Sequence, residues 1–202
     1  MSLTNYAELK VELESWSHRD DITGRLDTFI DLTEAKLWQE LRIRGMETRD
    51  ATLTSTDRII TLPTGFIAPR SLRYVDAIRY PTMEYVTPDN LEIDTASGIP
   101  TQFTFYGSEI ELNRNGSGTY TLIYYQSLTG LSAANTTNAV IDDYPNLYLY
   151  GGLAEVFAWA QDTEEETKWR GKFMMEIKDA NQKAKAGRYG PSPAANKRGS
   201  TP

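Results

Sequence analysis

The segment that most constrains the fold is YPNLYLYGGLAEVFAWAQD, residues 144–162, because at helical spacing it is apolar on more than one side. One stripe contains Leu147, Tyr150, Leu153 or Ala154, Phe157 and Ala160. Tyr148, Val156 and Trp159 lie well off that stripe. A helix with apolar residues on several sides packs against more than one partner. The sequence therefore predicts a helix packed on two sides, in which Gly151–Gly152 let a neighbouring backbone approach closely, at a cost in helix propensity of roughly 1 kcal/mol per glycine.

Two helices are predicted before this segment. Within residues 4–16, apolar side chains recur at helical spacing at Tyr6, Leu9, Leu13 and Trp16. A longer apolar pattern runs from Arg25 to Gly45, and glycine is a suitable residue just beyond a helix end. We expect the other face of the second helix to be solvated, since it carries Asp27, Asp31, Glu34, Lys36, Glu40 and Arg44.

The pattern becomes β-rich at Thr52. A polar turn at residues 55–57 predicts a hairpin, and residues 72–78 predict a strand between prolines. The segment TPDNLEI predicts a helical turn that begins at Thr87 and Pro88. Three alternating segments separated by glycine-containing turns follow and predict an antiparallel meander: TQFTFYG, SEIELN and GTYTLIYYQ.

A further helical pattern runs from Trp169 to Gly187, and its continuity through Glu164–Glu166 with the preceding helix is left open. From Gly187 the chain is rich in Gly, Pro and Ser, which predicts disorder in the free protein. The predicted fold class is α+β: an α-helical bundle with an inserted antiparallel β lobe. The predicted divisions are a discontinuous bundle of residues 1–51 and 143–187, a β lobe of residues 52–127, and a flexible basic C-terminal arm of residues 188–202.

The charge of the chain is unevenly distributed. The net charge is −7, yet the part after Asp179 contains no acid and five cations, so the rest of the chain carries −12. An acidic body argues against tight binding of nucleic acid, because such binding depends on neutralising phosphates. The composition of the end favours a docking arm about as well as a dispensable tail, and the arm residues are Lys183, Lys185, Arg188, Tyr189, Pro191, Lys197 and Arg198.

No motif for catalysis, metal binding or a cofactor is found in the sequence. The chain has no cysteine, and its one histidine, His18, lacks a recognisable nucleophile motif. Glu109 and Glu111 alternate as on the wet face of a strand, and Glu164–Glu166 resemble a solvated helix turn. No enzyme activity, cofactor, metal or membrane span is therefore expected. The N-terminus shows no secretory signal, so we expect a protein made in a cytoplasm.

The linear order of several segments resembles the head-to-tail adaptor (connector) proteins of tailed bacteriophages, in the branch found in short-tailed phages. The resemblance extends to about Asp162 and is carried by WSHRDDITGRLDTFIDLTEAKLWQELRIRGME, LPTGFIAPRSL, GIPTQFTFYGSEIELN, TLIYYQSLTGLS and YPNLYLYGGLAEVFAWAQD. It implies a helix bundle that assembles as a ring, usually of twelve subunits, between the portal and the next tail component. It also implies a C-terminal extension that wedges into the portal, here residues 183–202. The predicted β lobe is larger than in the smallest adaptors.

Several functional expectations follow from the resemblance. The protein would be a structural component of the virion neck, assembled in the host cytoplasm, with the portal protein, a tail nozzle or other tail component, and further copies of itself as partners. DNA would pass through the ring only as cargo, and an acidic channel would repel it. Subunit contacts would involve Tyr148, Val156, Trp159, Trp169 and Phe173.

Two alternatives belong to other functional classes. A tail-associated module could bind carbohydrate or a receptor through aromatic residues of the β lobe, and would predict sugar binding by that lobe. Packing in a sheet is the stronger explanation of the same aromatic residues, because a packed sheet contains such residues at alternating spacing: Phe103, Phe105, Tyr120, Tyr124 and Tyr125. A hydrolase is the weaker alternative, because it would need a cleft with paired carboxylates of shifted pKa.

Overall fold

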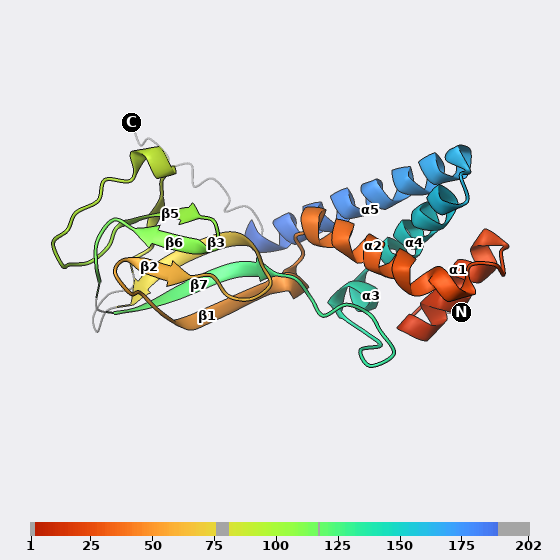
Figure 1. Ribbon diagram of the computed structural model, residues 1–202, viewed down its shortest axis with the longest axis horizontal. Helices are drawn as coiled ribbons and strands as arrows, with labels where there is room; N and C mark the ends of the chain where they lie inside the picture. The colour runs from red at the N-terminus through yellow and green to blue at the C-terminus, as the bar shows by residue number, and fades with distance from the viewer. Residues whose placement is uncertain (1–2, 76–80, 117, 190–202) are drawn as a thin grey trace, which may run out of the picture. The chain divides into compact units, whose positions relative to one another are not determined.

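The structure is a computed structural model that describes residues 3–75, 81–116 and 118–189 (Figure 1). The fold is α+β, as the sequence predicts. The chain forms two compact units. The helical unit contains the described residues up to Gly45 and from Thr129 onward, and the β unit contains those between Met46 and Leu128. The strands begin at Glu47, before the predicted boundary at Thr52.

The helical unit contains five helices, which Figure 1 labels. Their bounds are α1 Tyr6–Ser17, α2 Leu26–Glu40, α3 Ala139–Asp143, α4 Pro145–Trp159 and α5 Thr163–Tyr189, with short 3-10 turns at Thr23–Arg25 and Arg44–Met46. α2 ends before the predicted position at Gly45, because Leu41 adopts an extended backbone while its N–H still bonds to the carbonyl of Leu37.

Local capping determines where these helices begin. The side chain of Asn5 accepts a hydrogen bond from the N–H of Glu8 and caps α1. Asn138 caps α3 in the same way, and Asp142 and Asp143 lie inside this helix. α4 starts with Pro145 at its first position, where a missing N–H costs nothing.

α4 and α5 are separate helices, which settles the continuity that the sequence left open. Gln161 adopts a positive φ of 59°, which interrupts the helix between them. The carboxylate of Asp162 then accepts a hydrogen bond from the N–H of Glu165 at 3.2 Å and caps α5. α5 therefore includes the acidic residues 164–166 in its first turn, where the helix dipole favours them.

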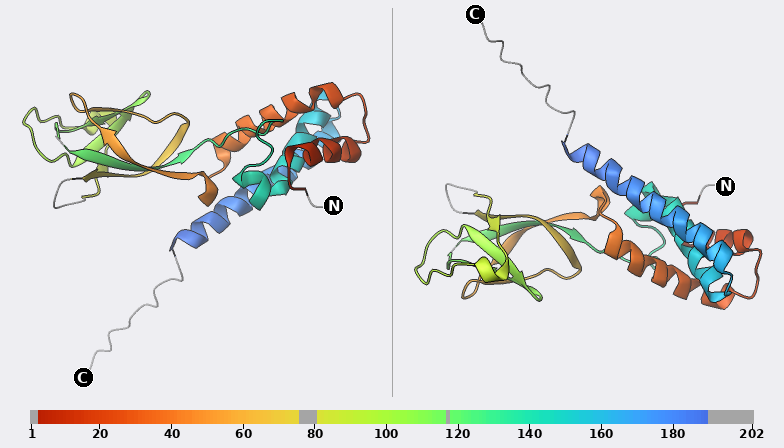
Figure 2. Two further views of the ribbon diagram at one scale, coloured as in Figure 1. Left: turned by 90° about the horizontal axis from the view of Figure 1, so that it is seen from below. Right: turned by 90° about the horizontal axis from the view of Figure 1, so that it is seen from above.

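α4 is the central helix of the unit and packs against α1, α2, α3 and α5 (Figure 2). Its two adjacent glycines lie at the closest contacts. A Cβ on Gly151 would lie 2.4 Å from Thr33 of α2 and 2.9 Å from Phe173 of α5. A Cβ on Gly152 would lie 2.7 Å from Leu13 of α1. The glycines thus allow three helices to approach one, as the two-sided pattern predicts.

The β unit contains two sheets. The three-stranded sheet has the order β1-β7-β3 and is antiparallel, with β1 Glu47–Thr54, β3 Phe66–Val75 and β7 Thr119–Gln126. The four-stranded sheet has the order β2-β6-β5-β4, with β2 Ile59–Thr61, β4 Glu84–Tyr85, β5 Gln102–Tyr106 and β6 Glu109–Leu112. β4 runs parallel to β5, so the lobe is not wholly antiparallel as predicted.

The strand pairing differs from the predicted hairpin and meander. A tight turn does lie at residues 56–59, but β1 and β2 on either side of it belong to different sheets. Of the predicted meander, β5 and β6 pair with each other as expected, whereas β7 enters the other sheet as its central strand. The helical turn predicted at Pro88 is the 3-10 turn Pro88–Asn90. The predicted strand to Ile78 is β3, which begins at Phe66, and residues 76–80 lie outside the described ones.

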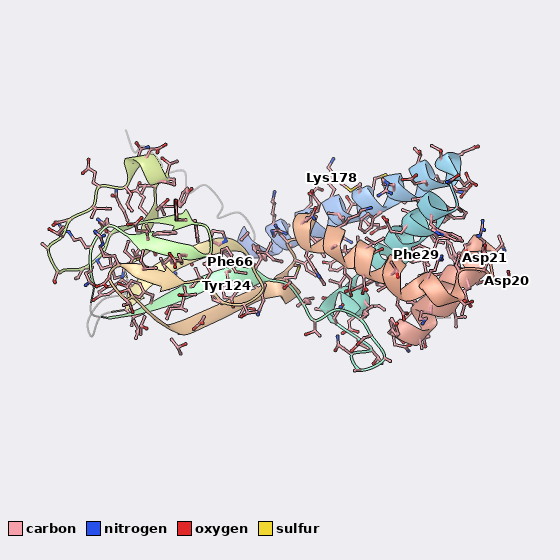
Figure 3. The ribbon with its side chains drawn as sticks, in the orientation of Figure 1. Asp20, Asp21, Phe29, Phe66, Tyr124 and Lys178 are labelled. Atoms are coloured by element: carbon pink, nitrogen blue, oxygen red, sulfur yellow. The ribbon has the colours of Figure 1, made fainter. Side chains whose placement is uncertain are left out.

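One apolar core joins the two sheets. Its buried members come from both: Ile60, Leu72, Tyr74, Met83, Phe103, Ile110, Leu112, Tyr120, Leu122 and Tyr124. Phe66 and Tyr124, labelled in Figure 3, stack with ring centroids 5.7 Å apart. Aromatic side chains of β5 and β7 therefore belong mostly to this core, which favours packing over an exposed binding platform.

Candidate functional site

The predicted portal-binding arm begins on the last turns of α5. Lys183 and Lys185 are exposed there. The helix continues through Arg188 and Tyr189, beyond the predicted end at Gly187. The other arm residues, Pro191, Lys197 and Arg198, lie outside the described residues. Cations near a helix C-terminus interact favourably with its dipole, so this composition also stabilises the end of α5.

A groove of about 460 Å³ lies beside this end of α5 in the helical unit. It is lined by Arg44, Asp143, Tyr144, Lys183, Ala184 and Gly187. Arg44 and Lys183 form no ion pair with any described residue. The groove at the start of the arm is therefore lined by two cations that could pair with a partner's acidic groups, together with one carboxylate and one tyrosine.

The five residues predicted for subunit contacts divide into two groups. Tyr148, Val156, Trp169 and Phe173 are buried within the helical unit of a single chain. Trp159 is 39% exposed. In the single chain, these four residues therefore pack within the subunit. Of the five, only Trp159 has surface that a second subunit could reach.

Trp169 shows how this internal packing is made. Its ring lies 5.7 Å from that of Trp16 and 5.6 Å from that of Tyr150, and Lys172 lies 4.3 Å above it. Its indole N–H donates a hydrogen bond to Glu165 at 2.9 Å. α1, α4 and α5 therefore meet at this residue.

Trp159 lies under two guanidinium groups at the end of α4. The guanidinium carbons of Arg19 and Arg25 lie 5.4 and 5.2 Å from its ring centroid. The ring of Phe29, a residue labelled in Figure 3, lies 6.1 Å away. Arg19 is also paired with Asp21. Trp and Arg are the side chains most enriched at interaction hot spots. No sequence pattern indicated this contact, because Arg19 and Arg25 lie between α1 and α2, Arg25 in the 3-10 turn Thr23–Arg25, where no periodicity shows which helix they contact.

Glu34 lies inside the helical unit, although the sequence analysis assigned it to a solvated face. Its Oε1 accepts hydrogen bonds from the hydroxyl of Tyr148 at 2.8 Å and from the N–H of Leu131 at 2.7 Å. Asn138 donates to the Tyr148 hydroxyl at 2.7 Å. Burial raises the pKa of Glu34 above its ordinary value, although both hydrogen bonds act in the opposite direction. This network fixes the loop after Thr129 to α2 and α4.

Glu155 of α4 is a second inward-facing acid and pairs with two cations. Lys36 of α2 forms an ion pair with it, and Arg170 of α5 lies 3.5 Å away. Arg170 also pairs with Glu166 at 2.7 Å. Lys36, expected on a solvated face of α2, therefore takes part in an ion pair between helices. These contacts connect the three helices that meet at Gly151.

The β unit offers no obvious sugar platform. Tyr85 and Tyr106 are 54% and 71% exposed. Tyr85 packs against Phe103 and Phe105, whereas Tyr106 follows Phe105 directly and so points to the opposite face of the sheet. A groove of about 480 Å³ lies elsewhere in this unit, lined by polar residues that include an ion pair of Asp94 with Arg114 at 2.6 Å. The two exposed tyrosines therefore do not share one binding surface.

No group of three or more potential metal ligands is found within the described part of the chain. None of the described helices combines the length and apolar character needed to cross a membrane.

Comparison with known proteins gives one match. A family model described as SU10 adaptor protein matches residues 4–197. None of the curated proteins compared with the chain matches it. The matched range includes both units and extends into the basic arm.

Proposed function

Because the chain belongs to the SU10 adaptor protein family, and is thus a phage adaptor with a structural role in the virion neck, we propose that it joins the portal to the next tail component. The proposed assembly is a ring of identical subunits, twelve in number, through which DNA passes. The arm of residues 183–202 docks to the portal. Assembly takes place in the host cytoplasm.

The observation that carries this proposal is the polarity of α5. The helix has 27 residues, begins with Glu164, Glu165 and Glu166, and ends with exposed Lys183 and Lys185. Its cationic end leads directly into the remaining arm residues and borders the groove with Arg44 and Lys183. A rigid helix can therefore present a concentrated positive charge to a partner, which steers and orients docking.

The charge of the rest of the chain fits a DNA channel. The part up to Asp179 carries −12, so a ring of such subunits would present strong negative potential. DNA would be repelled from the wall and slide without adhering. The monomer would meet the portal first through its arm, and the raised local concentration would then favour lateral contacts.

Co-sedimentation with portal rings from the same phage tests the docking step. We expect the full chain to sediment with the portal and a version ending at Gly187 to lose this binding. Replacing Lys183, Lys185, Arg188, Lys197 and Arg198 by glutamine should have the same effect, and added salt should weaken binding of the full chain.

The matched control removes cations from the other unit. Arg49 and Arg73 are exposed in β1 and β3, and their replacement by glutamine should leave sedimentation unchanged. Absence of binding by the full chain would refute the portal docking. Equal loss in the arm variant and the control variant would show that charge in general, and not the arm, drives association.

A further inference from the structure

The outer side of α5 has an exposed apolar centre. Met174 and Met175 are 49% and 67% exposed, and a Cβ added to Gly171, one turn earlier, would meet nothing within 4 Å. Lys178 lies one turn after Met175 on the outer side of α5, as Figure 3 shows, and forms no ion pair with a described residue. We call the surface of Gly171, Met175 and Lys178 the α5 face.

The outer side of α2 is also exposed and contains few charges. Leu32 is 45% exposed, and Thr28, Ala35 and Gln39 lie beside it at helical spacing. The one acid on this side without an ion pair among the described residues is Asp31. We call this surface, Thr28, Asp31, Leu32, Ala35 and Gln39, the α2 face.

The two faces lie at the same level of the helical unit. Thr33 of α2 and Phe173 of α5 both border Gly151. They therefore lie at the same height along the helix axes, which we call level. Further along, the side-chain amide of Asn181 donates a hydrogen bond to the carbonyl of Glu40 at 2.9 Å. Along α2 the contact residues come in the order Thr33, Glu40, and along α5 in the order Phe173, Asn181. The two helices therefore run in the same general direction (Figure 1). Advancing two residues along each helix from Thr33 and Phe173 makes Ala35 level with Met175.

The faces are complementary in charge as well as in level. The α5 face carries Lys178, which has no ion pair among the described residues, whereas the neighbouring Lys168 pairs with Glu165 at 2.9 Å. Asp179, next to Lys178, is exposed beside this face. The α2 face carries Asp31 and has no cation directed outward, because Lys36 pairs with Glu155. Methionine adapts its shape to an opposing surface, and Ala35 and Gly171 allow two helices to approach closely.

We propose that the α5 face of one copy of this chain packs against the α2 face of a second copy. A contact between two different faces leaves each subunit with one free face of each kind, so the contact can repeat. Because the faces are level, rotation about an axis along the helices repeats the contact without displacement along that axis, which is the condition under which the series can close into a ring. This inference deepens the proposed function, since it rests on the proposed ring and names the surfaces that would form it.

Cysteine cross-linking of the full chain on portal rings tests the proposal, because the chain has no cysteine of its own. The variant with Leu32→Cys and Met175→Cys should give a ladder of covalent oligomers with a short thiol-reactive cross-linker. Each single variant alone should stay monomeric, and an equimolar mixture of the two single variants should give dimers. Dimers from one single variant alone would indicate a two-fold contact and overturn the proposal.

The matched control moves one cysteine along the same side of α5. Leu32→Cys with Ala186→Cys places the second thiol on an exposed residue three turns from Met175, so it should give no ladder. Reversing the acid by Asp31→Lys should abolish the ladder of the Leu32–Met175 pair. The same change at Asp20, exposed in the α1–α2 loop, should leave it intact (Figure 3).

The outcomes separate this inference from the proposed function. If the cysteine variant still sediments with the portal but gives no ladder, the contact between the two faces is wrong while portal docking stands. If the chain does not sediment with the portal, the proposed function fails first. A ladder of equal strength from the Ala186 control would also overturn the inference, because it would reflect non-specific crowding.

Discussion

The hydroxyl of Tyr148 donates a hydrogen bond to Oε1 of Glu34 at 2.8 Å, inside the helical unit. The N–H of Leu131 donates to the same oxygen at 2.7 Å. A buried donor that loses its acceptor costs roughly 1–3 kcal/mol. One glutamate therefore satisfies two donors, from α4 and from the loop that precedes α3.

Replacing Glu34 by alanine should destabilise the protein strongly. We expect the free energy of unfolding to fall by about 2–4 kcal/mol, because two buried donors lose their acceptor. Glu34→Gln should cost less, since its amide oxygen can still accept both bonds. Urea denaturation of the free protein measures both values, and equal losses for alanine and glutamine would contradict the importance of the shared acceptor.

The same residue predicts a dependence of stability on pH. Burial raises the pKa of Glu34 above its ordinary value of 4.5. A carboxyl with a raised pKa binds its proton more tightly in the folded state than in the unfolded state. Its contribution to stability is therefore fully present below pH about 4.5 and is lost as the pH rises through the folded pKa. The stability of the wild type minus that of Glu34→Gln should accordingly decrease as the pH increases above that value, and an increase would contradict this assignment.

The two adjacent glycines of α4 should differ in their tolerance of alanine. At Gly151 the added methyl meets Thr33 and Phe173, from two helices, whereas at Gly152 it meets only the flexible end of Leu13. We expect Gly151→Ala to destabilise by roughly 1–3 kcal/mol and Gly152→Ala by less. Gly171→Ala on open α5 surface is the matched control and should stabilise by about 0.5–1 kcal/mol. Thermal denaturation gives the order, and a reversed order of the two α4 variants would refute the packing described.

The two tryptophans should respond differently to truncation. Trp169 is 6% exposed and Trp159 is 39% exposed. We expect Trp169→Ala to lower the free energy of unfolding by about 3–5 kcal/mol and Trp159→Ala by roughly 1–2 kcal/mol. The measurement uses the isolated chain, so an effect at Trp169 no larger than that at Trp159 would contradict the packing of Trp169 within the subunit.

The sequence predicted the helices better than the strand pairing, for a physical reason. A helix forms between neighbours in the chain, so the stripes that lead to Leu13, Phe29 and Phe173 were visible as periodicity. A strand pairs with a distant partner, and nothing local indicated that β7 would separate from β5 and β6 to join β1 and β3. Turn residues showed where each strand ended but not which sheet received it.

The candidate site was only partly visible in the sequence. The cationic arm could be identified from composition, because it needs no tertiary contact to exist. The role of Glu34 could not, since an acid on a helix is normally solvated. A signal did exist: Glu34 follows Ile30 by four residues and precedes Leu37 by three, which places it near the apolar stripe. Whether Tyr148 and Val156 are buried within the subunit or exposed to another subunit could not be predicted, because it depends on which helices pack around α4.

The most direct test of the central claim is a density map of the virion neck from the phage that encodes this chain. The account predicts a closed ring of this chain directly against the portal, with residues 183–202 inserted into portal density and the next tail component on the other side. Absence of the chain from the neck, or its density at the distal tail, would contradict the adaptor role at this position.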